Sequence, residues 1–236
     1  MQIGWLSRQG KARLGANNDA AAFGRNGNYV LAILVDAGER GDGQGLARHW
    51  SRTVVDVAVG EAQQLSPEGL VSIMRAEQQR LRQDYLHAIA SYCCVLIDLQ
   101  QQLIHVGHIG DCLVGLQRPG MPINWANRPH NLQKQAIWPG EISGINESRH
   151  LLTRSLNARR FCIPDWQMTQ LPWDGRLLLC SDGYWHEHLY SGIELQSVND
   201  DASMLSLEYG EPAIELQADC DNFRECIPST VTTTSA

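Results

Sequence analysis

The strongest constraint on the fold is a continuous apolar run, YVLAILV, at residues 29–35. A strand with one face in water alternates apolar and polar residues, whereas a strand buried on both faces is apolar throughout. The segment RLLLC at residues 176–180 has the same character. Strands of this kind need cover on both sides, so we expect two sheets stacked face to face.

Two helices are predicted in succession after a loop with four glycines at residues 36–45. In the first helix, apolar residues recur at helical spacing from Leu46 to Leu65. Ser66 and Pro67 suit the N-cap and first turn of the second helix. The two helices therefore separate two sets of strands, and we expect them on an outer face.

The remaining segments read mainly as strands. We expect a first strand at 2–8, hairpins over 88–117, a closing hairpin over 206–227, and an irregular stretch at 118–150 with one short helix at 131–137. Runs of strands beside runs of helices indicate the α+β class. The predicted architecture is a four-layer α-β-β-α sandwich, with two stacked, mainly antiparallel sheets flanked by helices.

Composition narrows the functional classes. The net charge of −7 argues against non-specific binding to nucleic acid or to an anionic membrane surface. No apolar stretch approaches the 18 residues of a membrane span, so we expect a cytoplasmic protein. Seven scattered cysteines without a C-x-x-C pair predict buried free thiols. We expect one domain over residues 1–228 and a loose tail at 229–236.

Four aspartates each follow an apolar segment: Asp36, Asp111, Asp182 and Asp221. Taken singly, each is an ordinary turn residue, because aspartate bonds readily to nearby backbone amides. If the strand ends meet at one edge, the carboxylates converge, and like charges stay ionised together only beside cations. All-oxygen ligation favours Mg²⁺ or Mn²⁺. Two such ions ~4 Å apart can activate a bridging water.

Five segments that span almost the whole chain carry a resemblance to a known family. They are RLGANNDA (13–20), LVDAGERGDGQG (34–45), IGDCLVGL (109–116), LLLCSDGYW (177–185) and DCDNFRECI (219–227). Their order and their places at strand ends resemble the metal-dependent protein phosphatases of the protein phosphatase 2C family. The resemblance implies a β-sandwich with helices outside and a serine/threonine phosphatase activity.

The resemblance also implies roles for individual residues. The implied roles are a bridge between two metals for Asp36, a carbonyl ligand for Ala37, completion of the second metal's shell for Asp182 and Asp221, contacts to metal-bound waters for Asn18, Asp19 and Asn222, a third, weaker ion for Asp111 with Asp182, and a grip on the substrate phosphate for Arg13. His49, on the helix after the glycine-rich loop, and His130, in the irregular stretch, are candidate general acids.

The predicted function is a metal-dependent serine/threonine protein phosphatase that uses a water activated between two Mn²⁺ or Mg²⁺ ions. We expect a monomer with a phosphoprotein substrate and a cognate serine/threonine kinase. Asn18, Ala37 and Cys112 differ from the family's Glu, Gly and Ser. These departures keep open an alternative: a catalytically weak, phosphatase-like regulatory or phosphoprotein-binding module.

Overall fold

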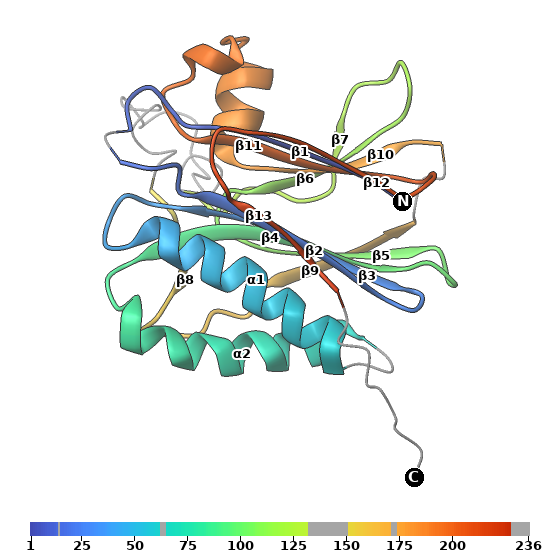
Figure 1. The fold of residues 1–236 in the computed structure, drawn as a ribbon, viewed down its shortest axis with the longest axis horizontal. Coiled ribbons are helices and arrows are strands. Elements are labelled where there is room, and N and C mark those ends of the chain that lie inside the picture. The colour runs from blue at the N-terminus through green and yellow to red at the C-terminus, as the bar shows by residue number, and fades with distance from the viewer. Residues whose placement is uncertain (14, 62–64, 132–150, 171–173, 228–236) are drawn as a thin grey trace, which may run out of the picture.

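The chain folds into two stacked β-sheets with helices on the outside (Figure 1). The computed structural model describes residues 1–13, 15–61, 65–131, 151–170 and 174–227. The expected α+β sandwich is confirmed, and the next paragraphs give its elements.

The first sheet has six strands in the order β12-β1-β11-β10-β6-β7. Their bounds are β1 Gln2–Arg8, β6 Leu113–Gln117, β7 Asn124–Trp125, β10 Arg176–Cys180, β11 Ala202–Glu208 and β12 Ala213–Ala218. The second sheet has the order β13-β2-β3-β4-β5-β9, and β8 pairs with β4. Its strands are β2 Asp19–Asn26, β3 Tyr29–Ala37, β4 Ile89–Asp98, β5 Leu103–Ile109, β8 Leu156–Asn157, β9 Asp165–Gln170 and β13 Phe223–Cys226.

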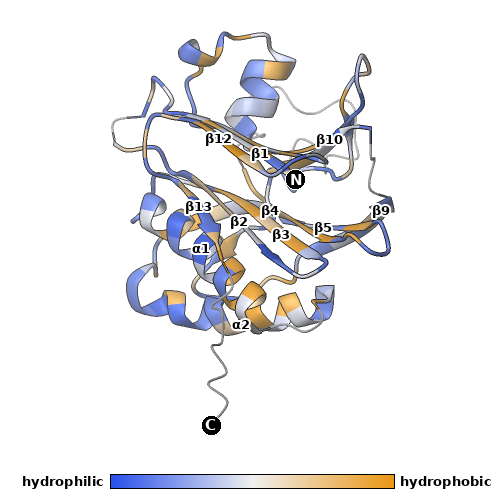
Figure 2. Ribbon diagram, turned by 45° about the vertical axis from the view of Figure 1, so that its right-hand side comes forward, coloured by the Kyte–Doolittle hydropathy of each residue, from blue (hydrophilic) through white to orange (hydrophobic). Residues whose placement is uncertain are grey.

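The apolar run in β3 is buried on both faces, as its sequence predicts. Leu31, Ile33 and Val35 pack in the core that includes the helices, whereas Val30 and Leu34 pack against the six-stranded sheet. Each of these side chains is 0% exposed. Figure 2 shows the hydrophobic colouring along β3, β4 and β5, between the facing sheets. Because successive side chains point to opposite faces, one strand serves two cores.

Helices α1 (Gly43–Glu61) and α2 (Pro67–Asp84) cover the outer face of the seven-stranded sheet (Figure 1). Ser66 caps α2 as expected, since its hydroxyl accepts a hydrogen bond from the Gly69 N–H. The six-stranded sheet carries a π-helix, η1 (Gly183–Tyr190), and a 3₁₀ turn, η2 (Leu195–Ser197). The helical layer on the six-stranded sheet is therefore much thinner than the layer of α1 and α2 on the seven-stranded sheet.

The closing hairpin predicted over 206–227 is wrong. Strand β12 pairs in parallel with β1, and β13 pairs in parallel with β2 in the other sheet. The reason is that β11 already has neighbours on both edges, β1 and β10, so β12 takes the free edge of β1. The helix predicted at 131–137 falls, from residue 132 onward, outside the described residues.

All seven cysteines are free thiols, which confirms the expectation from their scattered positions. Within the described ranges, no helix combines the length and the apolar character that crossing a membrane requires.

Candidate metal centre

Strand pairing brings the first two predicted carboxylates together. Asp19, at the start of β2, lies directly opposite Asp36, near the end of β3, in an antiparallel pair. On its other side, Asp36 faces Ser91 of β4. Directly opposed residues of antiparallel strands are ~5 Å apart, so two like charges meet at this sheet edge.

Asp111 joins this edge through Ser91. The Ser91 hydroxyl donates to Asp111 Oδ1 at 2.6 Å and accepts from the Asp111 N–H at 3.2 Å. The approach depends on Gly110, which has φ +89, and a Cβ there would lie 2.1 Å from Ser91 Oγ. Only glycine fits both the conformation and the space.

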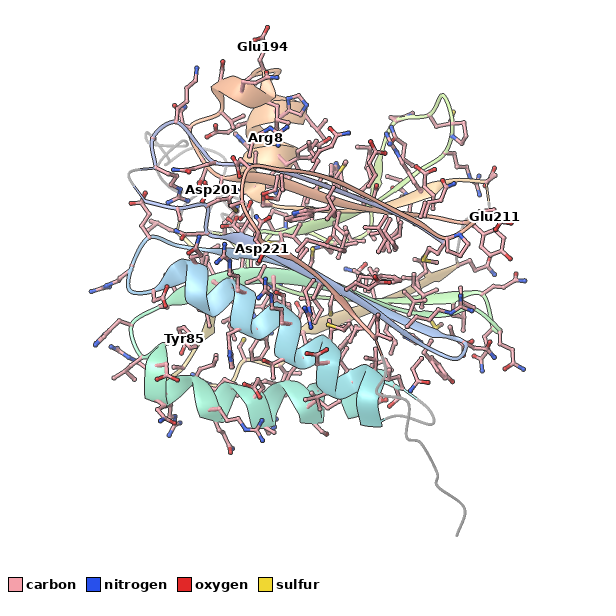
Figure 3. All side chains as sticks on the ribbon, in the orientation of Figure 1. Arg8, Tyr85, Glu194, Asp201, Glu211 and Asp221 are labelled. Atoms are coloured by element: carbon pink, nitrogen blue, oxygen red, sulfur yellow. The ribbon has the colours of Figure 1, made fainter. Side chains whose placement is uncertain are left out.

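The six-stranded sheet supplies the other carboxylates. Strands β10 and β11 are antiparallel, with Cys180 opposite Met204, so the end of β10 adjoins the start of β11. Asp182 follows β10, and Asp200 with Asp201 precede β11. Figure 3 shows Asp201 at the end of the sandwich opposite Glu211.

A hydrogen bond links the two sheets at this end. The Ser181 hydroxyl donates to Asp19 Oδ2 at 2.9 Å. Asp201 is buried and accepts from two backbone groups, the N–H of Gly10 at 2.9 Å and the N–H of Asn18 at 2.8 Å. Asp201 therefore fixes the loop between β1 and β2. Asp200 Oδ1 accepts from the Asp201 N–H at 2.8 Å and from Arg13, and the charge of Asp200 acts on Asp36.

Asp19, Asp36, Asp111, Asp182 and Asp200 form a cluster of carboxylates, which is the acidic centre of this site. Burial raises the pKa of Asp36 well above its usual value, and the charges of Asp19, Asp182, Asp200 and Asp111 raise it further. Burial also raises the pKa of Asp19, whose Oδ1 has no hydrogen-bond partner in the part of the chain that the structure describes. A buried, unpartnered carboxylate oxygen among like charges is the arrangement that a bound cation relieves.

Arg13 is the cation beside this cluster. It bonds to Asp200 Oδ1 through Nη2, its Nη1 lies 3.0 Å from Glu39 Oε1, and its Nε lies 3.7 Å from Asp201 Oδ2. Burial opposes the charge of Arg13, but Asp200, Glu39, Asp201 and Asp36 together raise its pKa above the ordinary value. The predicted phosphate-binding side chain thus lies at the centre, already held by acidic partners.

A polar cavity of about 410 Å³ opens beside Arg13. Its walls come from the loop after β1 and from the glycine-rich loop, with Arg13, Asn18, Glu39, Asp42 and Gln44 among the lining residues. The cavity therefore borders Arg13 together with two acidic residues, Glu39 and Asp42.

Asp221 has no contact to the buried carboxylates among the described interactions, so its role as a metal ligand stays a prediction. Its side chain is 90% exposed and lies 3.8 Å from Arg52 of α1. Residues 219–221 form a bend before β13, and Asn222 follows it as a buried residue. In the segment 219–227, Asn222 supplies a buried amide, and Asp219 accepts hydrogen bonds from the Gln9 N–H and from Asn17 Nδ2, in the loop between β1 and β2.

Asn222 is buried, and its hydrogen bonds connect the segment before β13 to β1 and β2. Its Oδ1 accepts from Trp5 Nε1 at 2.9 Å, and its Nδ2 donates to Ser7 Oγ at 2.8 Å and to the Asp19 carbonyl at 2.9 Å. Its predicted place beside metal-bound water is thus replaced by contacts to protein groups.

Asn222→Ala is expected to lower the free energy of unfolding by about 2–4 kcal/mol, because it leaves the buried Trp5 N–H without a partner. Urea denaturation followed by tryptophan fluorescence measures this loss. Asp221→Ala, next to it but exposed, is the matched control and should leave the midpoint unchanged. Equal midpoints for the two variants would contradict a structural role for Asn222.

His49 faces away from the centre, so its role as general acid is not supported. Its Nε2 lies 2.6 Å from Glu77 Oε1 of α2, and its ring packs on Tyr85, at the end of that helix (Figure 3). The buried Glu77 thus has two partners, His49 of α1 and Arg80 of its own helix, whose Nη1 lies 3.0 Å from Glu77 Oε2.

Ala37, the position where the family has glycine, is compatible with this backbone. Among the described residues other than glycine, only Gln102 has a positive φ. The Ala37 N–H donates to the Asn18 carbonyl at 3.3 Å, and the side chain is buried. Alanine therefore costs this site no backbone strain.

His108, His130 and Asp165 form a second polar group that could hold a metal ion, since their ligand atoms lie within 4.8 Å of one another. Both nitrogens of His130 are engaged: Nδ1 accepts from the Gly110 N–H at 3.2 Å, and Nε2 lies 3.0 Å from Asp165 Oδ2. Burial and the neighbouring His130 lower the pKa of His108 to about 4. As it stands, the group fixes the turn before Asp111.

Sequence reasoning missed Asp200, Asp201 and the supporting serines Ser91 and Ser181. A signal for the first two is present, because NDDASMLSLEY places an acidic pair before an alternating strand. Asp111 and Asp182 follow strands, whereas Asp200 and Asp201 precede one.

No protein-family model matches the sequence, and neither does any curated protein. Solved structures of bacterial serine/threonine phosphatases share its fold. Stp1 from Staphylococcus aureus superposes with a TM-score of 0.74 at 15% identity, over 88% of this chain and 94% of that chain. The PPM Ser-Thr phosphatase MsPP from Mycobacterium smegmatis, in complex with cacodylate, gives 0.68 at 20% identity, over 88% and 98%. PstP/Ppp from Mycobacterium tuberculosis gives 0.63 at 19%, over 88% and 98%.

Proposed function

We propose that this chain, which has the fold of the bacterial serine/threonine phosphatases, is a metal-dependent phosphatase acting on phosphoserine or phosphothreonine in proteins. The observation that carries the proposal is the convergence of Asp19, Asp36, Asp111, Asp182 and Asp200 at one end of the sandwich. Beside them lies Arg13, which lines a cavity of about 410 Å³. Several carboxylates and one arginine suit a phosphate ester held next to cations.

The residues present fit divalent cations. Asp19 Oδ1 is a buried oxygen without a partner in the described chain, and Asp36 stands among like charges. Asp36, Asp182 and Asp200 would hold two Mn²⁺ or Mg²⁺ ions, with the Ala37 carbonyl as a further ligand and Asp111 near a weaker third position. When bound, such ions supply a water nucleophile at neutral pH and neutralise charge on the phosphoryl oxygens.

The protein's own groups would orient the substrate. The planar guanidinium of Arg13 can donate two parallel hydrogen bonds to a phosphate. Ser181 and Ser91 hold Asp19 and Asp111 in fixed orientations, so these carboxylates need little rearrangement. Asn18, in place of glutamate, can still accept a hydrogen bond from water through its amide oxygen.

The substrate would be a phosphoprotein made by a serine/threonine kinase, and the protein would act in the cytoplasm as a monomer. The alternative is a catalytically weak phosphoprotein-binding module with the same fold. Arg13 is engaged by Asp200 and Glu39, and these bonds have to loosen before it can bind phosphate in either function.

Hydrolysis of p-nitrophenyl phosphate, titrated with Mn²⁺ and Mg²⁺ against an EDTA control, separates the two functions. Turnover that needs either metal supports the phosphatase, and phosphopeptides then define the substrate class. A folded protein without turnover in either metal would support the binding module instead.

Metal binding itself is expected to stabilise the fold. Mn²⁺ at about 100 times its dissociation constant adds about 2.7 kcal/mol to the free energy of unfolding, which is a rise in melting temperature of roughly 5–10 °C. Differential scanning fluorimetry with and without EDTA measures the shift. The same titration with Na⁺ at equal ionic strength is the control, and an equal shift there would point to screening of surface charge.

A further inference from the structure

A groove of about 850 Å³ lies between η1 and the β6–β7 hairpin, on the outer face of the six-stranded sheet. Its walls include Trp125, Trp185, Leu189 and Tyr190, with Arg128 at its rim. Tyr190 is 81% exposed and Leu189 is 40% exposed. In Figure 1, η1 and the loop that leads into β7 rise from the same face of the sheet.

The groove exists because this face has little helical cover. The opposite outer face carries α1 with 19 residues and α2 with 18, whereas η1 and η2 have 8 and 3. The apolar cluster under η1 is correspondingly small, and Ile123 and Trp125 pack only at its margin. Aromatic side chains that border a groove in this way are typical of binding surfaces.

The groove continues to the acidic centre. Trp185 lines it, and the Trp185 indole N–H donates to the Asp111 carbonyl at 2.9 Å. Trp185 also follows Asp182, the N-cap of η1, by three residues, so both lie in the first turn of that helix. An extended peptide advances ~3.3 Å per residue. A chain with its phosphorylated residue at the centre would therefore reach the groove within a few residues.

We propose that this groove binds the polypeptide flanking the phosphorylated residue and selects an apolar side chain followed by an acidic one. The inference rests on the proposed phosphatase function. The aromatic and aliphatic walls match a leucine or phenylalanine, and Arg128 matches a carboxylate.

The test compares two phosphopeptides that differ only in the flank, Leu-Glu in one and Gly-Lys in the other. Wild-type protein with Mn²⁺ is expected to favour the Leu-Glu peptide about tenfold in kcat/KM, the scale of one filled apolar pocket. Tyr190→Ala should remove most of that preference and leave hydrolysis of p-nitrophenyl phosphate unchanged. Tyr209→Ala, an exposed tyrosine at the far end of the sandwich, is the matched control.

Arg128→Glu is the sharper variant, because it should reverse the charge preference in favour of a Leu-Lys flank. Fluorescence anisotropy with the unphosphorylated, labelled peptides reports binding independently of turnover. Failed hydrolysis of every phosphate ester, with binding that Tyr190→Ala abolishes, would sink the phosphatase proposal and support the groove. Equal hydrolysis and equal binding of both flanks would overturn the groove.

Discussion

Asp36→Asn is expected to abolish metal-dependent hydrolysis of p-nitrophenyl phosphate while making the metal-free protein more stable. The loss follows because Asp36 lies between the carboxylates of both sheets, where it would contact both ions. Removing a charge that contributes several kcal/mol of transition-state stabilisation lowers kcat/KM by about 10³-fold or more. The gain in stability follows because asparagine removes one charge from a like-charged group.

The expected gain in stability of the metal-free Asp36→Asn protein can be checked by the pH dependence of the free energy of unfolding. Burial and neighbouring charges raise the native pKa values of Asp19 and Asp36. The native state then binds more protons than the unfolded state, so their contribution is fully present below pH ~4 and is lost as pH rises through the native values. In EDTA, urea denaturation at pH values above the ordinary pKa of histidine should show stability falling as pH rises towards the native carboxyl values, and His108 does not mask the trend there. Burial also raises the pKa values of Cys94 and Cys180, which add a slope of the same sign at alkaline pH, so the comparison with Asp36→Asn isolates the carboxylate.

Asp36→Asn should flatten that slope, and saturating Mn²⁺ should flatten it in the wild type. An Asp36→Asn protein that keeps wild-type turnover would remove Asp36 from the mechanism. One that loses activity and also unfolds more readily in EDTA would mean that the carboxylate supports the fold rather than the ions.

Asp200→Asn is expected to reduce metal-dependent turnover by about 10²-fold or more, whereas Asp221→Asn should change it by less than about twofold. Asp200 raises the pKa of Asp36 and bonds to Arg13, so it lies at the centre. Asp221 is exposed beside Arg52. Both substitutions remove one negative charge, which makes each the control for the other.

Steady-state kinetics over a range of Mn²⁺ concentrations measures the effect. Asp200→Asn should raise the Mn²⁺ concentration required for half-maximal activity, and Asp221→Asn should leave it at the wild-type value. The reverse ranking would mean that Asp221 is a metal ligand. The bend at residues 219–221 would then have to change conformation when the metal binds.

Much of the site could be predicted from the chain. Asp36 and Asp182 end buried strands, so local pattern was sufficient to single them out, whereas Asp19 and Arg13 were predicted from the family resemblance. Asp221 was predicted from both, but its side chain is exposed in the bend before β13. Asn222 faces inward there, and no local feature of DCDNFREC records which of the two neighbours does so.

The sequence by itself determined the layers, because a strand buried on both faces leaves an uninterrupted apolar run and a surface helix leaves a periodic one. The tertiary structure alone decided which carboxylates meet. Asp200 reaches Asp36 because β11 runs antiparallel to β10 and its start therefore adjoins the end of that strand. Strand partners and register depend on contacts between residues far apart in the chain, and local periodicity carries no record of them.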